Sequence, residues 1–287
     1  MPIEEASGLE VFSNPYNVIL CDVWGVIHNG VEAFGPACEA LQNFRQNSHG
    51  TVILLTNAPR PYWWIERQLD GLNVSRDVYD AIVTSGDVTR HALETSGKTK
   101  VYALGPDKDT DFYNGLPIDL VSADEAELVS ITGLIDDETE TPDDYGEMLT
   151  DFKKRGLSVI CANPDLVVER GDKLVYCGGA LAERYREMGG SVSYFGKPHA
   201  PIYKLAIETS QKVTNLDPDK IRPLAIGDGV NTDVKGANDA GIDCLFVTGG
   251  IHSAEDGPLS NPTPQSVFDF LNERNRQAKG FMPTLKW

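Results

Sequence analysis

The sequence predicts an α/β protein in which a doubly wound parallel sheet carries an inserted second α/β domain. Short apolar runs alternate with helical patterns at both ends of the chain, as in a parallel sheet covered by helices on both faces. The middle of the chain has a different pattern, and 287 residues suffice for two domains at about 100–200 residues each. A composition of 41% hydrophobic and 24% charged residues is ordinary for a globular protein and argues against disorder, collagen and coiled coil.

The two outer parts of the chain supply the elements of the first sheet. In the N-terminal part we expect strands at 17–22, 51–56 and 81–84, and helices at about 36–46, at about 61–69 and after Gly86. In the C-terminal part we expect strands at 222–227 and 243–247, and helices at 201–211, about 231–240 and around 265–277. The strand runs are short and apolar, which is typical of strands buried on both faces.

The middle of the chain predicts a separate domain at 98–191, inserted between sheet-domain parts at 1–97 and 192–287. Its expected strands are 101–104, 129–135 and 157–162, and a hairpin is expected from 166–169 and 173–177 around Arg170-Gly171-Asp172. Within the acidic run 136–144, we interpret the first half as a solvated loop and Thr141-Pro142 as the start of a helix.

The charge balance bears on partners and location. With 25 basic and 43 acidic residues the chain has a formal charge of −18, which disfavours nucleic acid and anionic membranes as partners. No apolar run approaches the roughly 18 residues of a spanning helix, and the acidic N-terminus lacks a signal-peptide pattern, so we expect a cytoplasmic protein.

The five cysteines show no C-x-x-C spacing, which argues against a disulfide framework or zinc site. A homo-oligomer is left open.

Three of the expected strands end in polar residues that suit a reaction site. These endings are Asp22, Thr56-Asn57 and Asp228, and in open α/β sheets ligands bind at the carboxyl ends of the strands. Two neighbouring carboxylates are tolerable only with a proton or cation between them, and oxygen ligands favour Mg²⁺. Asp233 lies five residues after Asp228 and suits either this cation site or the start of the next helix.

A lysine follows another expected strand end. Lys197 lies within Phe195-Gly196-Lys197-Pro198-His199, where the glycine allows close approach of the backbone and the proline suits a helix start. Such a lysine can neutralise a carboxylate nucleophile and a transferring phosphoryl group. On its own, a lysine in such a position is more often a surface charge, so Lys197 gains weight only together with the other motifs.

Taken together, these motifs resemble a known enzyme superfamily. Four short stretches follow one another in the order of the four motifs of the haloacid dehalogenase (HAD) superfamily. They are Asp22 with Gly25, Thr56-Asn57, Gly196-Lys197-Pro198, and Gly227-Asp228 with Asp233. Three stretches resemble the class IIA branch of this superfamily, which contains sugar-phosphatase and nitrophenylphosphatase-like proteins. These stretches are 22–30, 35–41 and Ala162-Asn163-Pro164-Asp165. The resemblance implies a Rossmann-like core, and the long separation of Thr56 from Lys197 places the cap domain after the second motif.

The resemblance also implies a nucleophile and a metal site. Asp22 would attack phosphorus and form an aspartyl-phosphate, which splits a difficult displacement into two easier steps. Mg²⁺ would be held by the Asp22 carboxylate, the backbone carbonyl of Trp24 and Asp228, with Asp233 in support.

Phosphate and substrate contacts are implied in the same way. Thr56 and the backbone amide of Asn57 would bind the phosphoryl oxygens, and Lys197 would offset their charge. Cap residues Asn163 and Asp165 would lie over the substrate. The implied partner is a small phosphorylated metabolite.

Trp24 breaks the pattern of the family's phosphatases. They have a second aspartate at this position, which protonates the leaving oxygen and then activates water, whereas an indole can do neither. The loss of such help costs about 10²–10⁴-fold in rate. His28, four residues later, is the candidate replacement acid.

Three functions therefore stay open at this point. The first is a Mg²⁺-dependent phosphomonoesterase acting through Asp22. The second is a protein that binds a phosphorylated metabolite with little or no turnover. The third is a carbon–halogen hydrolase that forms an ester on Asp22 and needs no acid. The chain has neither a G-x-G-x-x-G fingerprint nor a phosphate-binding P-loop, so a nicotinamide dehydrogenase or P-loop NTPase fits poorly.

Overall fold

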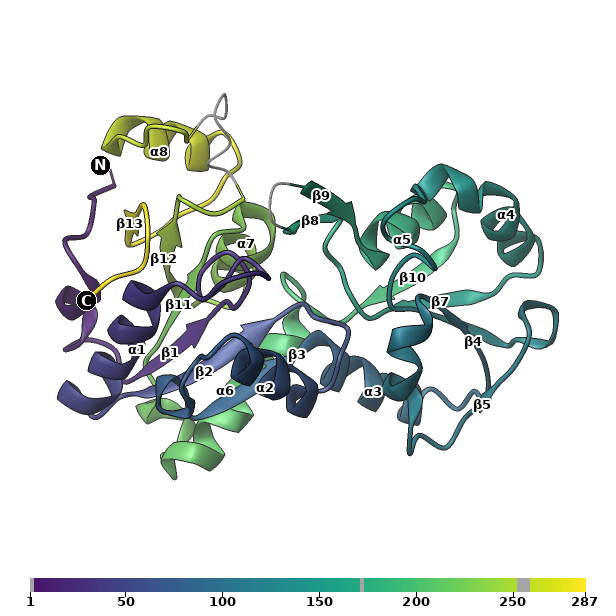
Figure 1. Cartoon of the computed structure of the whole chain (residues 1–287), viewed down its shortest axis with the longest axis horizontal. Helices are drawn as coiled ribbons and strands as arrows, with labels where there is room; N and C mark the ends of the chain where they lie inside the picture. Colours follow the sequence, from purple (N-terminus) through teal and green to yellow (C-terminus); the bar gives the residue numbers. More distant parts are fainter. Residues whose placement is uncertain (1–2, 171–172, 252–258) are drawn as a thin grey trace. The chain divides into compact units, whose positions relative to one another are not determined.

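The computed structural model describes residues 3–170, 173–251 and 259–287, and the chain divides into two compact units (Figure 1). The core unit comprises Met1–Thr56, Glu66–Val83 and Ile202–Trp287, and the cap unit comprises Asn57–Ile65 and Thr84–Pro201. The cap unit includes the whole of the predicted inserted domain, 98–191, and adds segments on either side of it.

The core unit is built on a six-stranded sheet with the order β13-β12-β11-β1-β2-β3. Strand β1 pairs in parallel with both β2 and β11, and β12 pairs in parallel with β11 and β13. The bounds of the strands are β1 Val18–Cys21, β2 Thr51–Thr56, β3 Ala81–Thr84, β11 Pro223–Gly227, β12 Asp243–Val247 and β13 Gly280–Met282. Every residue of β1 is buried, which explains why it is an uninterrupted apolar run. The predicted parallel α/β class is therefore confirmed.

Helices join the strands of this sheet. They are α1 Gly35–Asn47, α2 Tyr62–Gly71, α6 Ala200–Thr214, α7 Lys235–Asp239 and α8 Pro264–Asn272. The helix predicted at about 231–240 is a π-helical turn, Val230–Val234, followed by the short α7. The predicted last helix ends early, at Asn272, and β13 was not predicted. No helix in the described part of the chain is both long and apolar enough to span a membrane.

The cap unit has its own five-stranded parallel sheet, with the order β10-β7-β6-β4-β5. The bounds of its main elements are α3 Ser85–Thr95, β4 Lys100–Leu104, β5 Asp119–Leu120, β6 Leu128–Ile131, α4 Gly146–Lys154, β7 Ser158–Cys161, α5 Gly178–Glu187 and β10 Ser191–Tyr194. The predicted boundary at 191 falls at the start of β10, which belongs to the cap sheet because it pairs with β7. The strand predicted at 129–135 ends at Ile131.

Apolar side chains cover both faces of the cap sheet. Val129 and Ile131 of β6 pack in one cluster with Phe152 of α4 and Tyr185 of α5. Leu128, which precedes Val129 and therefore points to the other face, packs in a second cluster beneath α3. The unit thus has a hydrophobic core on each side of its sheet.

The first half of the acidic run of the cap unit is a largely exposed loop, as predicted, and ion pairs hold it in place. Asp137 accepts hydrogen bonds from Lys108 and from Arg170 at the end of β8 (Val167–Arg170), at 3.2 and 2.8 Å. The Arg170 guanidinium holds the pKa of Asp137 below its usual range. The two strands of the predicted hairpin are confirmed as β8 and the antiparallel β9 (Lys173–Tyr176), whereas the expected turn at 171–172 lies outside the described residues. Thr141 forms a capping box with Asp144, which confirms the predicted helix start, although its first turn is 3₁₀.

Candidate active site

Three buried carboxylates meet at one edge of the core sheet. Asp22 follows β1, and Asp228 and Asp233 follow the neighbouring strand β11. Each offers an oxygen within 4.8 Å of the others, and their exposed fractions are 7%, 6% and 4%. Like charges held this closely and this deeply require a cation or proton between them. The structure therefore brings these three carboxylates together, as predicted.

Asp22 is fixed by hydrogen bonds along its own backbone. Its N–H donates to the carbonyl of Ile226 at 2.8 Å, which extends the pairing of β1 with β11 by one residue. Its Oδ1 atom accepts the N–H of Val23 at 2.7 Å. The carboxylate is therefore oriented before any ligand binds.

Asp228 fits only because two glycines leave room for it. A Cβ atom at Gly25, whose φ is +82°, would lie 2.2 Å from Asp228 Oδ2, and one at Gly250 would lie 1.9 Å from the same atom. Oδ2 also accepts the N–H of Ile251 at 2.8 Å. Gly250 was not recognised from the sequence, where the only signal is the Gly249-Gly250 pair soon after β12.

Asp233 is held within the π-helical turn that follows β11. Its Oδ2 atom accepts the N–H of Gly229 at 3.1 Å and the hydroxyl of Thr232 at 3.2 Å. A Cβ atom at Gly227 would lie 2.1 Å from Asp233 Cγ, so the strand end and the turn are in close contact. These bonds fit the supporting role expected for Asp233.

Trp24 lies in a folded flap that follows Asp22. The N–H of Gly25 donates to the carbonyl of His28 at 2.8 Å, and the rings of Trp24 and His28 meet edge to face with centroids 5.1 Å apart. A Cβ atom at Gly30, whose φ is +88°, would lie 2.5 Å from the indole of Trp24. The indole therefore packs against the flap itself.

The environment of His28 disfavours its protonated form. It is 1% exposed, and burial lowers its pKa to about 4. Its Nδ1 atom accepts the N–H of Gly30 at 2.9 Å, which places the proton of the neutral ring on Nε2. Nε2 has no hydrogen-bond partner among the described residues. The structure thus argues against the hypothesis that His28 replaces the missing aspartate as a general acid at neutral pH.

Thr56, the last residue of β2, is 6% exposed within the core unit. The other expected phosphate and substrate residues lie in the cap unit, where Asn57 brings two of them together. Asn57 Oδ1 accepts the N–H of Lys197 at 2.6 Å, and its Nδ2 donates to the Lys197 carbonyl and to Asp165 Oδ1 at 3.0 and 2.8 Å. Asn163 Oδ1 accepts the N–H of Asp165 at 3.1 Å, so Asn163 shapes the same loop.

Comparison with known proteins agrees with this geometry. A family model described as haloacid dehalogenase-like hydrolase matches residues 19–118, and a related HAD-hydrolase-like model matches residues 194–274. The crystal structure of a haloacid dehalogenase-like hydrolase from Brucella suis 1330 is 41% identical, with a TM-score of 0.87 and coverage of 98% of this chain and 99% of that one. The chain belongs to the haloacid dehalogenase-like hydrolase family.

More distant relatives with curated names match over most of their length. The 5'-nucleotidase YutF of Bacillus subtilis is 23% identical over 261 residues, covering 90% of this hydrolase and 97% of YutF. An acid sugar phosphatase of Staphylococcus aureus strain USA300 is 23% identical over 265 residues, covering 90% and 96%.

The site of this haloacid dehalogenase-like hydrolase suits a hard divalent cation. All three side chains offer carboxylate oxygen, the donor type that Mg²⁺ prefers, and none of the three is a cysteine or histidine. Asp22, Asp228 and Asp233 are therefore the residues that fit a metal here.

Proposed function

We propose that this enzyme is a Mg²⁺-dependent phosphomonoesterase that acts on small phosphorylated metabolites through an aspartyl-phosphate on Asp22. The observation that carries the proposal is the buried group of Asp22, Asp228 and Asp233, whose oxygens lie within 4.8 Å of one another. The similarity to a 5'-nucleotidase and to an acid sugar phosphatase supports a phosphate ester as the substrate.

In the proposed reaction, a carboxylate oxygen of Asp22 attacks phosphorus while the bond from phosphorus to the ester oxygen breaks, and the leaving group departs as an alkoxide or phenoxide that takes its proton from water. Water then attacks the phosphorus of the aspartyl-phosphate, which releases phosphate and restores the Asp22 carboxylate. The Thr56 hydroxyl and the Asn57 backbone amide donate to the phosphoryl oxygens, and the Lys197 ammonium offsets their charge.

Mg²⁺ would be held by Asp22, the backbone carbonyl of Trp24 and Asp228, with Asp233 in support. When bound, the ion neutralises the carboxylate and phosphoryl charges that would otherwise repel each other. Asp22 can then approach the phosphoryl group despite its own negative charge.

Trp24 defines which phosphate esters are expected to react well. Because the indole cannot protonate a leaving oxygen, esters whose alcohol leaves readily as an anion, such as a nitrophenyl ester, should be cleaved faster than alkyl esters. The second step also lacks a base at this position, so the aspartyl-phosphate should hydrolyse slowly.

The same tryptophan favours a second candidate, a phosphometabolite-binding protein without efficient turnover. A carbon–halogen hydrolase also needs no acid, but the buried carboxylate group fits a metal-dependent phosphate reaction better.

A substrate panel tests these candidates. Sugar phosphates, nucleoside 5'-phosphates, nitrophenyl phosphate and a haloacid are incubated with the protein, with Mg²⁺ or with a chelator, and Asp22→Asn is the control. We expect phosphate release that requires both Mg²⁺ and Asp22. Mg²⁺-dependent ligand binding without turnover would instead establish the binding protein, and metal-independent halide release would establish the dehalogenase.

A further inference from the structure

The Asn57 side chain uses its hydrogen-bonding groups within the protein. Its Oδ1 atom accepts the N–H of Lys197 at 2.6 Å, and its Nδ2 group donates both to the carbonyl of Lys197 and to Asp165 Oδ1. A side-chain amide has two donor hydrogens, and both are directed at these two oxygens. Both backbone polar groups of Lys197 are thus bonded to one side chain.

The packing around Asn57 is close. Asn57 is 4% exposed and Lys197 is 2% exposed. A Cβ atom at Gly196 would lie 2.4 Å from Asn57 Oδ1, 2.7 Å from Ser85 Oγ and 2.8 Å from Pro164 Cδ. The loops that contain Asn57, Pro164 and Gly196 therefore meet at a point where only a glycine fits.

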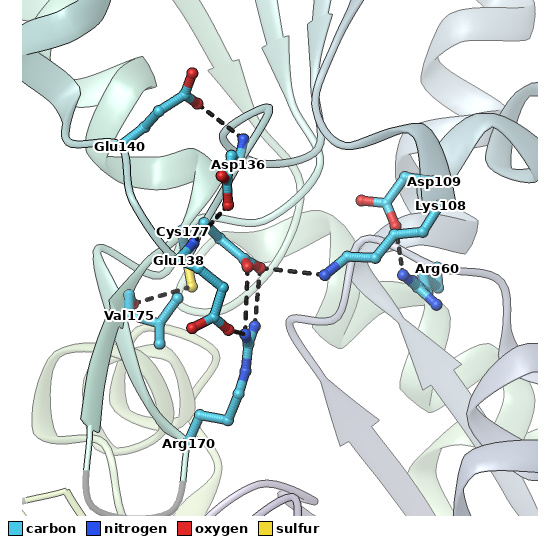
Figure 2. Close-up of polar contacts among 10 residues, drawn as sticks. Arg60, Lys108, Asp109, Asp136, Glu138, Glu140, Arg170, Val175 and Cys177 are labelled. Carbon is cyan, nitrogen blue, oxygen red and sulfur yellow. Dashed lines mark hydrogen bonds and ion pairs between the residues drawn. The ribbon is translucent and has the colours of Figure 1, made fainter.

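The segment that begins with Asn57 is anchored to the cap unit at further points. Arg60 forms an ion pair with Asp109 at 2.6 Å, and their side chains are 12% and 5% exposed (Figure 2). The Arg60 guanidinium also lies 3.6 Å from the centre of the Trp64 ring. The segment is therefore rigidly held, so Asn57 presents its amide from a fixed backbone.

We propose that Asn57 is a positioning residue that fixes Lys197 and the loop of Asn163 and Asp165 in one arrangement. This inference rests on the proposed function, in which Lys197 offsets the phosphoryl charge and the loop contacts the substrate. The Asn57 side chain then acts through these neighbours, while its backbone amide contacts the phosphate. Loss of the Asn57 side chain should lower kcat because Lys197 is displaced, and it should raise KM because the loop of Asn163 and Asp165 is displaced.

A charge swap provides the kinetic test. Asn57→Asp retains the acceptor for the Lys197 N–H but places a second carboxylate against Asp165. Adding Asp165→Asn restores an amide–carboxylate hydrogen bond with its direction reversed. We expect Asn57→Asp to lower kcat/KM by about 10- to 100-fold and the double variant to regain about tenfold.

The matched control is Asn114→Asp. Asn114 also donates its Nδ2 to an aspartate, Asp111, at 2.9 Å in the cap unit, but this pair is exposed. The control should change kcat/KM by less than about twofold. A double variant no better than Asn57→Asp, or an Asn57→Asp variant as active as the control, would overturn the proposal.

Amide hydrogen exchange at Lys197 tests the positioning without relying on activity. In Asn57→Ala the Lys197 N–H loses its acceptor, so its exchange should be about tenfold faster or more, while α4 stays protected as evidence that the cap unit is folded. Asn57→Asp, which keeps the acceptor, should retain most of the protection. Unchanged exchange in a folded Asn57→Ala variant would overturn the proposal. A wild-type protein with no phosphatase activity would overturn the proposed function, whereas the exchange result would still decide the positioning.

Discussion

The backbone of Gly25 lies directly against the carboxylate of Asp228. A Cβ atom at position 25 would be 2.2 Å from Asp228 Oδ2, and the φ of +82° at Gly25 is in the region that favours glycine. The glycine that follows Trp24 therefore serves the proposed metal site as well as the turn of the flap.

Gly25→Ala should weaken Mg²⁺ binding. The added methyl group forces the Asp228 carboxylate to move, so we expect the apparent affinity for Mg²⁺ to fall by about 10- to 100-fold, measured from the Mg²⁺ dependence of phosphate release. Gly97→Ala is the control, because Gly97 has a similar φ of +71° but nothing within 4 Å of its added Cβ. Equal effects of the two variants would show that backbone strain, and not displacement of Asp228, is responsible.

Asp228→Asn should stabilise the protein without Mg²⁺ and abolish stabilisation by Mg²⁺. Removing one of three negative charges within 4.8 Å relieves repulsion, so urea unfolding in a chelator should require more denaturant. The wild type should gain about 2.7 kcal/mol when Mg²⁺ is present at 100 times its Kd, and the variant should gain much less. A wild type whose stability does not respond to Mg²⁺ would contradict the assignment of the metal site.

His28→Asn should make the fold less sensitive to acid. Burial lowers the pKa of His28 in the folded protein to about 4, whereas the ordinary pKa of histidine is 6.5. As the pH falls below 6.5, His28 therefore takes up a proton in the unfolded chain before it does so in the folded protein. Stability is therefore lost between about pH 6.5 and pH 4, by about 2–3 kcal/mol from this group. Asparagine keeps an acceptor for the N–H of Gly30 but does not titrate.

Urea unfolding at pH 7 and pH 4.5 measures this effect. The His28→Asn variant should lose less stability between the two pH values than the wild type, whereas His91→Asn, on the exposed surface of α3, should behave like the wild type. Phosphatase activity of His28→Asn at pH 7 should remain within a few-fold of the wild type. A fall of 10²-fold in kcat would restore His28 as the acid.

Trp24→Asp should raise the rate with alkyl phosphates. The new carboxyl group supplies the missing acid and base, and we expect kcat to rise by about 10- to 100-fold, short of the full effect of an acid because the indole also packs on Gly30. Trp24→Asn removes the same packing without supplying an acid, so it should show no gain. A rate for Trp24→Asp at or below that of the wild type would mean that the site has been rebuilt around the indole.

The core strands could be predicted because burial on both faces leaves an apolar run that sequence alone reveals. β2 at 51–56, β3 at 81–84 and β12 at 243–247 match their predicted bounds. Helix α5 and strand β13 could not be found in this way. α5 begins with two glycines, which disfavour a helix, and forms because Leu181 and Tyr185 pack into the cap core. β13 is only three residues long and depends on β12 for its pairing.

The convergence of the buried carboxylates was predictable where they lie at strand ends. Asp22 and Asp228 follow neighbouring strands, so the order of the strands in the sheet brings them together independently of the conformation of the loops. Gly250 could not be assigned, because its role depends on a contact with Asp228 from a distant part of the sequence. The bonds between Asn57 and Lys197 likewise join residues 140 positions apart. Asp137 lies in the predicted loop, but its ion pair with Arg170 could not be predicted, because the two residues are far apart in the sequence.

The most direct measurement of the central claim is a rapid-mixing experiment with nitrophenyl phosphate. If Asp22 accepts the phosphoryl group and Trp24 cannot activate water, nitrophenol should appear in a burst of about one equivalent per active site before a slower steady rate. The burst should require Mg²⁺ and disappear in Asp22→Asn, and acid quenching should recover phosphate bound to Asp22. A burst that persists in Asp22→Asn or in a chelator would contradict the account, as would steady hydrolysis that leaves no phosphate on the enzyme.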